Sequence, residues 1–193
     1  NIIEACFIGI SNDGITNKGN AGDGIVVFSA NNLIGNPSGA RNVISGNGHS
    51  GVRISEAFST GNLIRNNYIG TDLNGSSPVE NLFSGIYIYQ SSQDTIGGLG
   101  FFGMNIISGN LTAGIRIEGG LAQHIVIRNN RIGTTANGSS ALGNKHGIEI
   151  IYGTGGAAGS PSNILIGGKW SEAQNLISGN LQVGVAFFFD ATN

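Results

Sequence analysis

The chain has 193 residues, of which 34 are glycine and only 3 are proline, and this composition excludes a collagen-like repeat. Charged residues make up 10% of the chain and the formal net charge is −2, so charge gives no basis for binding nucleic acid or an anionic membrane. The longest apolar run, near 185–189, is far too short to span a bilayer, and the single cysteine, Cys6, excludes an internal disulfide framework.

In chain order, the first pattern is a recurring signature, Gly-(Ile/Val)-x-(Ile/Val/Phe), whose copies are 27, 34, 29, 33 and 37 residues apart. A spacing of about 20–50 residues is typical of a solenoid, in which each repeat forms one coil. The strands that begin with this signature are called the Gly-led strands below. Their glycines are Gly24, Gly51, Gly85, Gly114, Gly147 and Gly184.

Two further short apolar strands lie between one Gly-led strand and the next. The second strand of each coil ends at Ile3, Ile34, Ile64, Ile96, Ile127 or Ile166. The third strand ends at Ile8, Ile44, Ile69, Ile107, Ile132 or Ile177. Because no hairpin signal joins them, equivalent strands are expected to stack in parallel on the next coil, with right-handed crossovers.

The sequence therefore predicts an all-β fold, a right-handed parallel β-helix (solenoid) of about six three-stranded coils. Residues 1–193 are predicted to form a single domain. Because the chain opens in mid-repeat at Asn1, we expect it to be a segment of a longer protein.

The linkers alternate in length from coil to coil. In one coil the second and third strands are joined by residues 65–66 alone, and the long linker 70–81 leads to the Gly-led strand. In the next coil the long linker is 97–104, between the second and third strands, and the third strand runs directly into the Gly-led strand. Two coils therefore form one larger repeat of roughly 61–70 residues.

Asparagine recurs at the expected corners, where positive φ angles favour Asn and Gly. One set lies four residues before the signature glycine, except for Asn144, which is one residue out of register: Asn20, Asn47, Asn81, Asn110, Asn144 and Asn180. Another set lies two residues before the end of the third strand: Cys6, Asn42, Asn67, Asn105, Asn130 and Asn175. The equivalent positions of the second strand are Asn1, Asn32, Asn62, Asp94, Ile125 and Ile164. Stacking at about 4.8 Å per coil predicts hydrogen-bonded Asn ladders, an interpretation favoured over a row of ligand-binding side chains.

Apolar residues occupy every second position of the Gly-led strands, as in strands that bury one face. This alternation predicts that three pairs of residues fill the lumen of the helix: Ile86 and Ile88, Ile115 and Ile117, and Ile148 and Ile150.

These motifs resemble the right-handed parallel β-helix repeat of the pectate-lyase-like superfold, in a subtype of large bacterial secreted or surface proteins. The pattern is carried by Tyr68–Gly75, Gly85–Ile88, Ile96–Gly98 and Asn105–Asn110, and the resemblance covers essentially the whole chain. The chain departs from this pattern at Cys6, at Ile10 and at 186–189. The resemblance implies this fold and an extracellular or cell-surface location. It does not fix an activity, because the same scaffold carries lyases, hydrolases, epimerases, adhesins and passive spacers.

On the middle coils, the outward positions of the Gly-led strands are occupied by polar and aromatic residues. The first row reads Val26, Arg53, Tyr87, Arg116, Glu149 and Ala186, and the second reads Phe28, Ser55, Tyr89, Glu118, Ile151 and Phe188. Tyrosine faces flanked by charged groups suit a sugar polymer. The candidate carbohydrate-binding residues are Arg53, Tyr87, Tyr89, Arg116, Glu118 and Glu149. The alternative is an ordinary exposed face on which Arg116 pairs with Glu149 one coil further along.

A catalytic site is not evident on this face. The resemblance implies that lyases of the superfold use clustered carboxylates for Ca²⁺ with a basic residue, and that hydrolases use several Asp on neighbouring coils. No Asp lies on this face before Asp190. Glu118, Glu149 and Arg116 are weak catalytic candidates, because the two carboxylates lie in different rows and acid–base work needs a fixed separation of about 5–9.5 Å.

No metal or cofactor is expected either. His49 and His146 lie three coils apart, roughly 14 Å, which is too far for a shared metal ion. Asp13, Asp72 and Asp94 lie in expected turns, where a capping role is favoured over Ca²⁺ binding.

The outward positions of the other two sets of strands form apolar rows. The third strands give Phe7, Val43, Tyr68, Ile106, Arg131 and Leu176, and the second strands give Ile2, Leu33, Leu63, Thr95, Val126 and Leu165. Either the long linkers fold over these rows or the rows form an interface. The open coil ends, including 187–189, favour a homo-oligomer or end-to-end association.

From these features we predict a non-enzymatic structural or interaction solenoid of a secreted or cell-surface bacterial protein. The alternative is a carbohydrate-binding or polysaccharide-modifying β-helix that uses the outer face of the Gly-led strands. The expected partners are a polysaccharide or another protein, with no nucleic acid and no membrane span.

Overall fold

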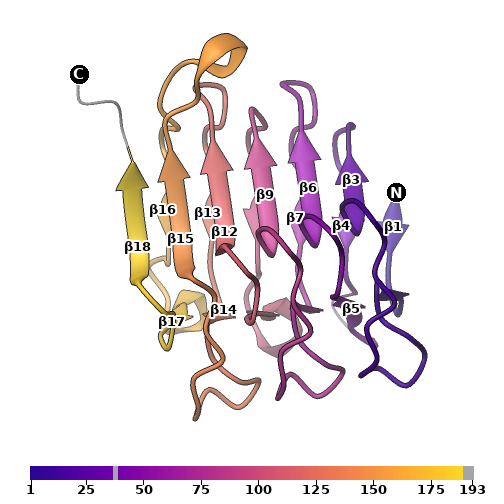
Figure 1. Ribbon diagram of the computed structural model, residues 1–193. Helices are drawn as coiled ribbons and strands as arrows, with labels where there is room; N and C mark the ends of the chain where they lie inside the picture. The colour runs from indigo at the N-terminus through magenta and orange to yellow at the C-terminus, as the bar shows by residue number, and fades with distance from the viewer. Residues whose placement is uncertain (37–38, 189–193) are drawn as a thin grey trace.

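The computed structural model describes residues 1–36 and 39–188 of the chain, and its strands form three parallel sheets of six strands each. Successive coils stack along one axis from the N-terminal to the C-terminal end (Figure 1). The architecture is a right-handed parallel β-helix of about six coils, as the repeat spacing predicts. Within the described ranges, no helix is both long and apolar enough to cross a membrane.

Each sheet takes one strand from every coil. The Gly-led sheet contains β3 (Ile25–Val27), β6 (Val52–Ser55), β9 (Ile86–Tyr89), β12 (Ala113–Glu118), β15 (His146–Ile151) and β18 (Val183–Phe188). The second sheet contains β1 (Ile2–Ile3), β4 (Leu33–Ile34), β7 (Leu63–Ile64), β10 (Thr95–Ile96), β13 (Val126–Ile127) and β16 (Leu165–Ile166). The third sheet contains β2 (Phe7–Ile8), β5 (Asn42–Ile44), β8 (Asn67–Ile69), β11 (Asn105–Ile107), β14 (Asn130–Ile132) and β17 (Leu176–Ile177). Every second and third strand ends at the predicted isoleucine.

The coils stack without offset, so equivalent side chains lie directly above one another. In the Gly-led sheet Ile88 pairs with Ile117, and Ile117 pairs with Ile150. These side chains are buried in the lumen, which confirms the predicted inward positions. The signature glycine is needed where coils approach closely: a Cβ on Gly85 would lie 2.7 Å from Ile107 Cγ2 and 2.8 Å from the Gly114 carbonyl oxygen.

The predicted Asn ladders are present at all three corners. In the third-sheet ladder, each side-chain amide donates to the Oδ1 of the next asparagine, from Asn42 through Asn67, Asn105 and Asn130 to Asn175. The ladder before the Gly-led sheet runs from Asn20 through Asn47, Asn81, Asn110 and Asn144 to Asn180. Asn144 therefore joins this ladder despite its shift by one residue in the sequence. The second-sheet ladder is shorter and passes from Asn1 through Asn32 and Asn62 to Asp94.

Asp94 ends the short ladder as a buried carboxyl group. It accepts hydrogen bonds from Asn62 and Ser91, and burial raises its pKa from 3.8 to about 6. The folded chain therefore holds this proton more tightly than the unfolded chain does. The resulting stability is fully present below about pH 3.8 and is lost as the pH rises through about 6.

We predict that Asp94→Asn stabilises the fold near neutral pH by roughly 2–3 kcal/mol, because the amide carries no charge to bury. The free energy of unfolding, measured by denaturant titration at several pH values, checks this. The advantage of the variant over the parent should grow as the pH rises from 3.8 to about 6. An advantage that stays constant over that interval would show that Asp94 does not titrate there.

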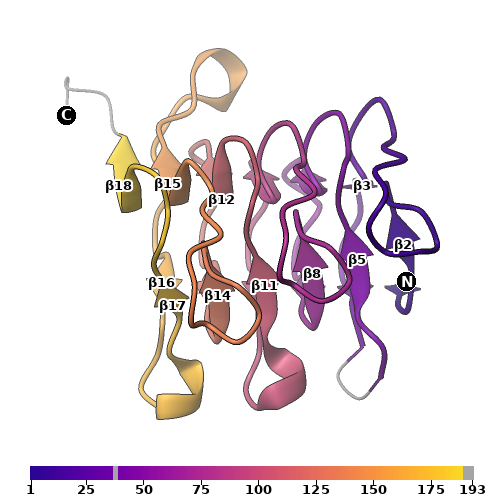
Figure 2. The ribbon, with the colours of Figure 1, turned by 60° about the horizontal axis from the view of Figure 1, so that its bottom comes forward.

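Long linkers and short turns alternate along the edge between the second and third sheets (Figure 2). Two long linkers contain 3₁₀ helices that the sequence did not predict, η1 (Phe101–Gly103) and η3 (Ser171–Ala173), and a third, η2 (Gly155–Ala157), follows β15. The short turns contain Asn66 and Asn129, both with positive φ. The Asn66 side chain donates to the carbonyls of Asn36 and Gly39, so a short turn anchors the neighbouring long linker.

The linkers after the third strands cover part of the apolar row of the third sheet. Ile10 and Val79, from these linkers, form a small core with Val43 and Tyr68. Val43 and Ile106 are buried, and at Val43 the predicted alternative in which linkers fold over the row is confirmed. The rows stay exposed at their ends, at Ile2, Phe7, Leu165 and Leu176. Phe189 and Asp190 lie outside the described residues.

Candidate functional site

The predicted sugar-binding residues lie together on the outer face of the Gly-led sheet. Strand pairing aligns the first row in the order Arg53, Tyr87, Arg116 and Glu149. In the second row Tyr89 pairs with Glu118. The six residues therefore occupy four adjoining coils, from β6 to β15, as the alternation along the strands predicts.

Arg116 joins the two carboxylates of this face. Its Nη2 lies 2.8 Å from Glu118 Oε2 and its Nη1 lies 3.3 Å from Glu149 Oε2. The Tyr87 hydroxyl donates to the same Glu118 oxygen, and His146 Nε2 lies 3.6 Å from Glu149 Oε1. Burial, reinforced by the Glu118 carboxylate, raises the pKa of Tyr87 above its ordinary value. The pair between Arg116 and Glu149 that the alternative of an ordinary face predicts is present, and Glu149 is buried.

Aromatic rings cover one side of this network. The guanidinium carbon of Arg53 and that of Arg116 each lie 5.8 Å from the centroid of the Tyr87 ring. The Phe83 ring lies 5.7 Å from the Tyr87 ring and is stacked on His49 at 4.8 Å. Cations over aromatic faces are favourable contacts, so the two arginines and the Tyr87 ring stabilise one another.

Phe83 and His49 were not predicted to lie on this face, and His49 was considered only as a metal ligand. Both lie in linkers just before Gly-led strands, whereas the predicted rows considered strand positions alone. His49 Nδ1 lies 2.7 Å from Asp23 Oδ1, one coil earlier. The signal was present in the repeat, because Asp23 directly precedes Gly24 in the same linker of the preceding coil.

The expected capping carboxylates are in place. Asp13 accepts hydrogen bonds from Ser11 and from the backbone of Ile15 and Thr16, and the bonds from Thr16 lower its pKa most. Asp72 caps the equivalent turn two coils later through Ser76 and Ser77. In the part of the chain that the structure describes, no three His, Cys, Asp or Glu side chains gather closely enough to hold a metal ion.

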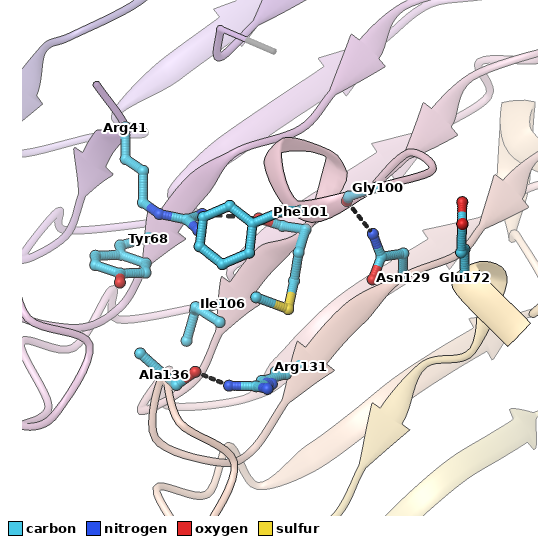
Figure 3. Close-up of a pocket in the computed structure, with 10 residues that line it drawn as sticks. Arg41, Tyr68, Gly100, Phe101, Ile106, Asn129, Arg131, Ala136 and Glu172 are labelled. Carbon is cyan, nitrogen blue, oxygen red and sulfur yellow. Dashed lines mark hydrogen bonds between the residues drawn. The ribbon is translucent and has the colours of Figure 1, made fainter. Parts of the chain in front are cut away.

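A pocket of about 480 Å³ lies on the third sheet, where no site was predicted (Figure 3). It extends over strands β8, β11 and β14, and residues from the η1 linker and from η3 line its rim. Its lining consists of Arg41, Tyr68, Gly100, Phe101, Met104, Ile106, Asn129, Arg131, Ala136 and Glu172. Most of these residues belong to linkers, whose course the repeat does not determine. The one signal in the strands was Arg131, a charge in an otherwise apolar row.

No protein-family model, curated protein or solved structure matches this chain. We therefore base the proposed function on the chemistry of two surfaces, the outer face of the Gly-led sheet and the pocket on the third sheet.

Proposed function

We propose that this chain is a non-enzymatic structural and interaction solenoid of a secreted or cell-surface bacterial protein, a member of the pectate-lyase-like β-helix repeats. The observation that carries this proposal is the pairing of both candidate catalytic carboxylates with one guanidinium, that of Arg116. A general acid or base must exchange a proton with the substrate, whereas the carboxylates of Glu118 and Glu149 are both engaged in ion pairs with Arg116. The Asn ladders and the packed lumen provide a rigid support on which the outer surfaces can contact a partner.

A second candidate function is carbohydrate binding by the outer face of the Gly-led sheet. It is favoured by Arg53, which forms no ion pair with a carboxylate among the described residues, in contrast to Arg116. The half-buried rings of Tyr87 and Tyr89, 6.0 Å apart, lie on the adjoining coil. An unpaired guanidinium beside aromatic rings offers donors and a flat apolar surface to a sugar ring.

One experiment tests both functions: a panel of neutral and acidic polysaccharides is scored for binding to the protein and for new reducing ends or unsaturated products. We expect no degradation of any polymer. If the face binds sugar, Tyr87→Ala should weaken binding about tenfold or more, because it removes a ring and a hydroxyl together.

Phe28→Ala is the matched control, since Phe28 is an exposed aromatic residue directly after β3, the first strand of the same sheet, away from the middle coils. Degradation that disappears in Glu149→Gln would contradict the non-enzymatic proposal. Binding that is equal in the parent and in Tyr87→Ala would remove the sugar-binding candidate.

A further inference from the structure

Basic charge gathers along the edge that joins the second and third sheets. The linkers of this edge contain Arg41, Arg65, Arg128 and Lys169, and Arg131 follows on β14. These are five of the nine Lys and Arg residues of a chain whose net charge is −2. The same linkers contain two carboxylates, Glu4 and Glu172. The excess of positive charge along this edge attracts anions.

Arg41 presents a fixed and partly desolvated cation to the pocket. Its guanidinium carbon lies 4.8 Å from the centroid of Tyr68 and 5.9 Å from that of Phe101, so the group lies against two aromatic rings (Figure 3). Its Nη1 donates to the Met104 carbonyl at 2.8 Å. Burial lowers the pKa of Arg41, which shows that water solvates the charge poorly. A desolvated cation is costly unless an anion is nearby.

Arg131 reaches the same pocket from another wall. It extends from β14 and donates through Nη1 to the Ala136 carbonyl, which fixes its direction. Figure 3 shows Ile106 between Arg41 and Arg131, and all three residues line the same pocket. Neither arginine forms an ion pair with a carboxylate in the described part of the chain. An anion above Ile106 would face both cations.

The walls of the pocket are anchored. Asn129 donates to the carbonyls of Gly98 and Gly100, both at 2.7 Å, and so fixes the η1 linker that contributes Phe101 and Met104. Glu172 lines the far end of the pocket. With two guanidinium groups and one carboxylate, the lining has a net charge of +1, which a single negative charge neutralises. A phosphate monoester brings close to two negative charges at neutral pH and matches this lining less well.

We propose that this pocket binds an organic monocarboxylate. The carboxylate accepts hydrogen bonds from the guanidinium groups of Arg41 and Arg131, whose planar forks match its geometry. The body of the ligand lies against Met104 and the exposed Phe101 ring. Either an aromatic acid or a sugar acid presents this chemistry, and the two are distinguished experimentally.

Calorimetric titration of the whole chain with benzoate and glucuronate, and with their uncharged counterparts benzamide and glucose, tests the proposal. Inorganic phosphate is the anion control. At least one carboxylate should bind, at least about tenfold more tightly than its uncharged counterpart and than phosphate. The carboxylate that binds identifies the body of the ligand. Arg131→Met should weaken its binding by at least about tenfold, whereas Arg131→Lys should retain part of it.

Arg128→Met is the matched control, because Arg128 lies on the same edge without lining the pocket, and it should leave binding unchanged. Far-UV circular dichroism and the melting temperature establish that each variant is folded. If Arg131→Met does not fold, Arg41→Met replaces it. The proposal is overturned if neither carboxylate binds, if the uncharged counterparts or phosphate bind equally well, or if the folded arginine variant binds like the parent.

Discussion

Ile117→Asp should prevent the chain from folding. Ile117 is fully buried in the lumen, stacked in register between Ile88 of the preceding coil and Ile150 of the next. The substitution removes about 2–5 kcal/mol of buried apolar packing and adds a carboxylate with no partner, which costs several kcal/mol more. A domain of this size has a total stability of only about 5–15 kcal/mol, so the combined loss exceeds what the fold can absorb.

The measurement is the yield of soluble protein together with far-UV circular dichroism and thermal melting. Val26→Asp is the matched control, since Val26 is an aliphatic residue at an exposed outward position of the same sheet. It should fold and melt within a few degrees of the parent. A soluble Ile117→Asp protein with unchanged spectrum and melting temperature would refute the inward assignment of this position.

Asn105→Leu should destabilise the fold by about 3–5 kcal/mol, although the two side chains are similar in size. Asn105 is buried at the middle of its ladder and its side chain makes four hydrogen bonds. Its Oδ1 accepts from the backbone and side chain of Asn67, and its Nδ2 donates to the Ile64 carbonyl and to Asn130. The Ile64 carbonyl keeps the Gly97 N–H and the Asn67 amide keeps two carbonyls, but leucine takes the acceptor from the Asn67 N–H and the donor from Asn130 Oδ1. Each such loss at a buried group costs about 1–3 kcal/mol.

Equilibrium denaturation in urea measures this loss. Cys6→Ala is the control from the same column, because the Cys6 thiol donates to the Glu4 carbonyl and takes no part in the chain of asparagine side chains. Its effect should stay within about 0.5 kcal/mol. Equal stabilities for the parent and Asn105→Leu would show that the ladders contribute nothing to folding beyond filling space.

The sequence predicted those features that repeat with the coil. The ends of the second and third strands, the inward isoleucines and the outward rows all follow from the spacing of apolar residues. Even Asn144 takes its place in a ladder despite its shifted position, because the stacked backbone fixes where the corner lies. The positions of Tyr87 and Arg116 on the candidate sugar face were predictable for the same reason.

Features that depend on the linkers were not predictable. The pocket on the third sheet combines Arg41 with Phe101 and Glu172, from three long linkers in different coils. The 3₁₀ helices in two of these linkers, and their anchoring by Asn129, are set by contacts between coils rather than by a periodic pattern. That linkers fold over the apolar row was one of two alternatives left open, and only the structure shows which linker residues cover Val43.

The central claim is that neighbouring coils stack in parallel and in register, and paired cysteines test it most directly. In a Cys6→Ala background, Val26→Cys is combined either with Arg53→Cys, its register partner, or with Ser55→Cys, two residues further along β6. Stacked partners lie about 4.8 Å apart, within the range that a disulfide spans, whereas the offset pair is about 8 Å apart. Mild oxidation should therefore join 26 to 53 within one molecule and leave 26 and 55 as free thiols. Efficient bridging of 26 to 55 with none between 26 and 53 would contradict the stacked β-helix.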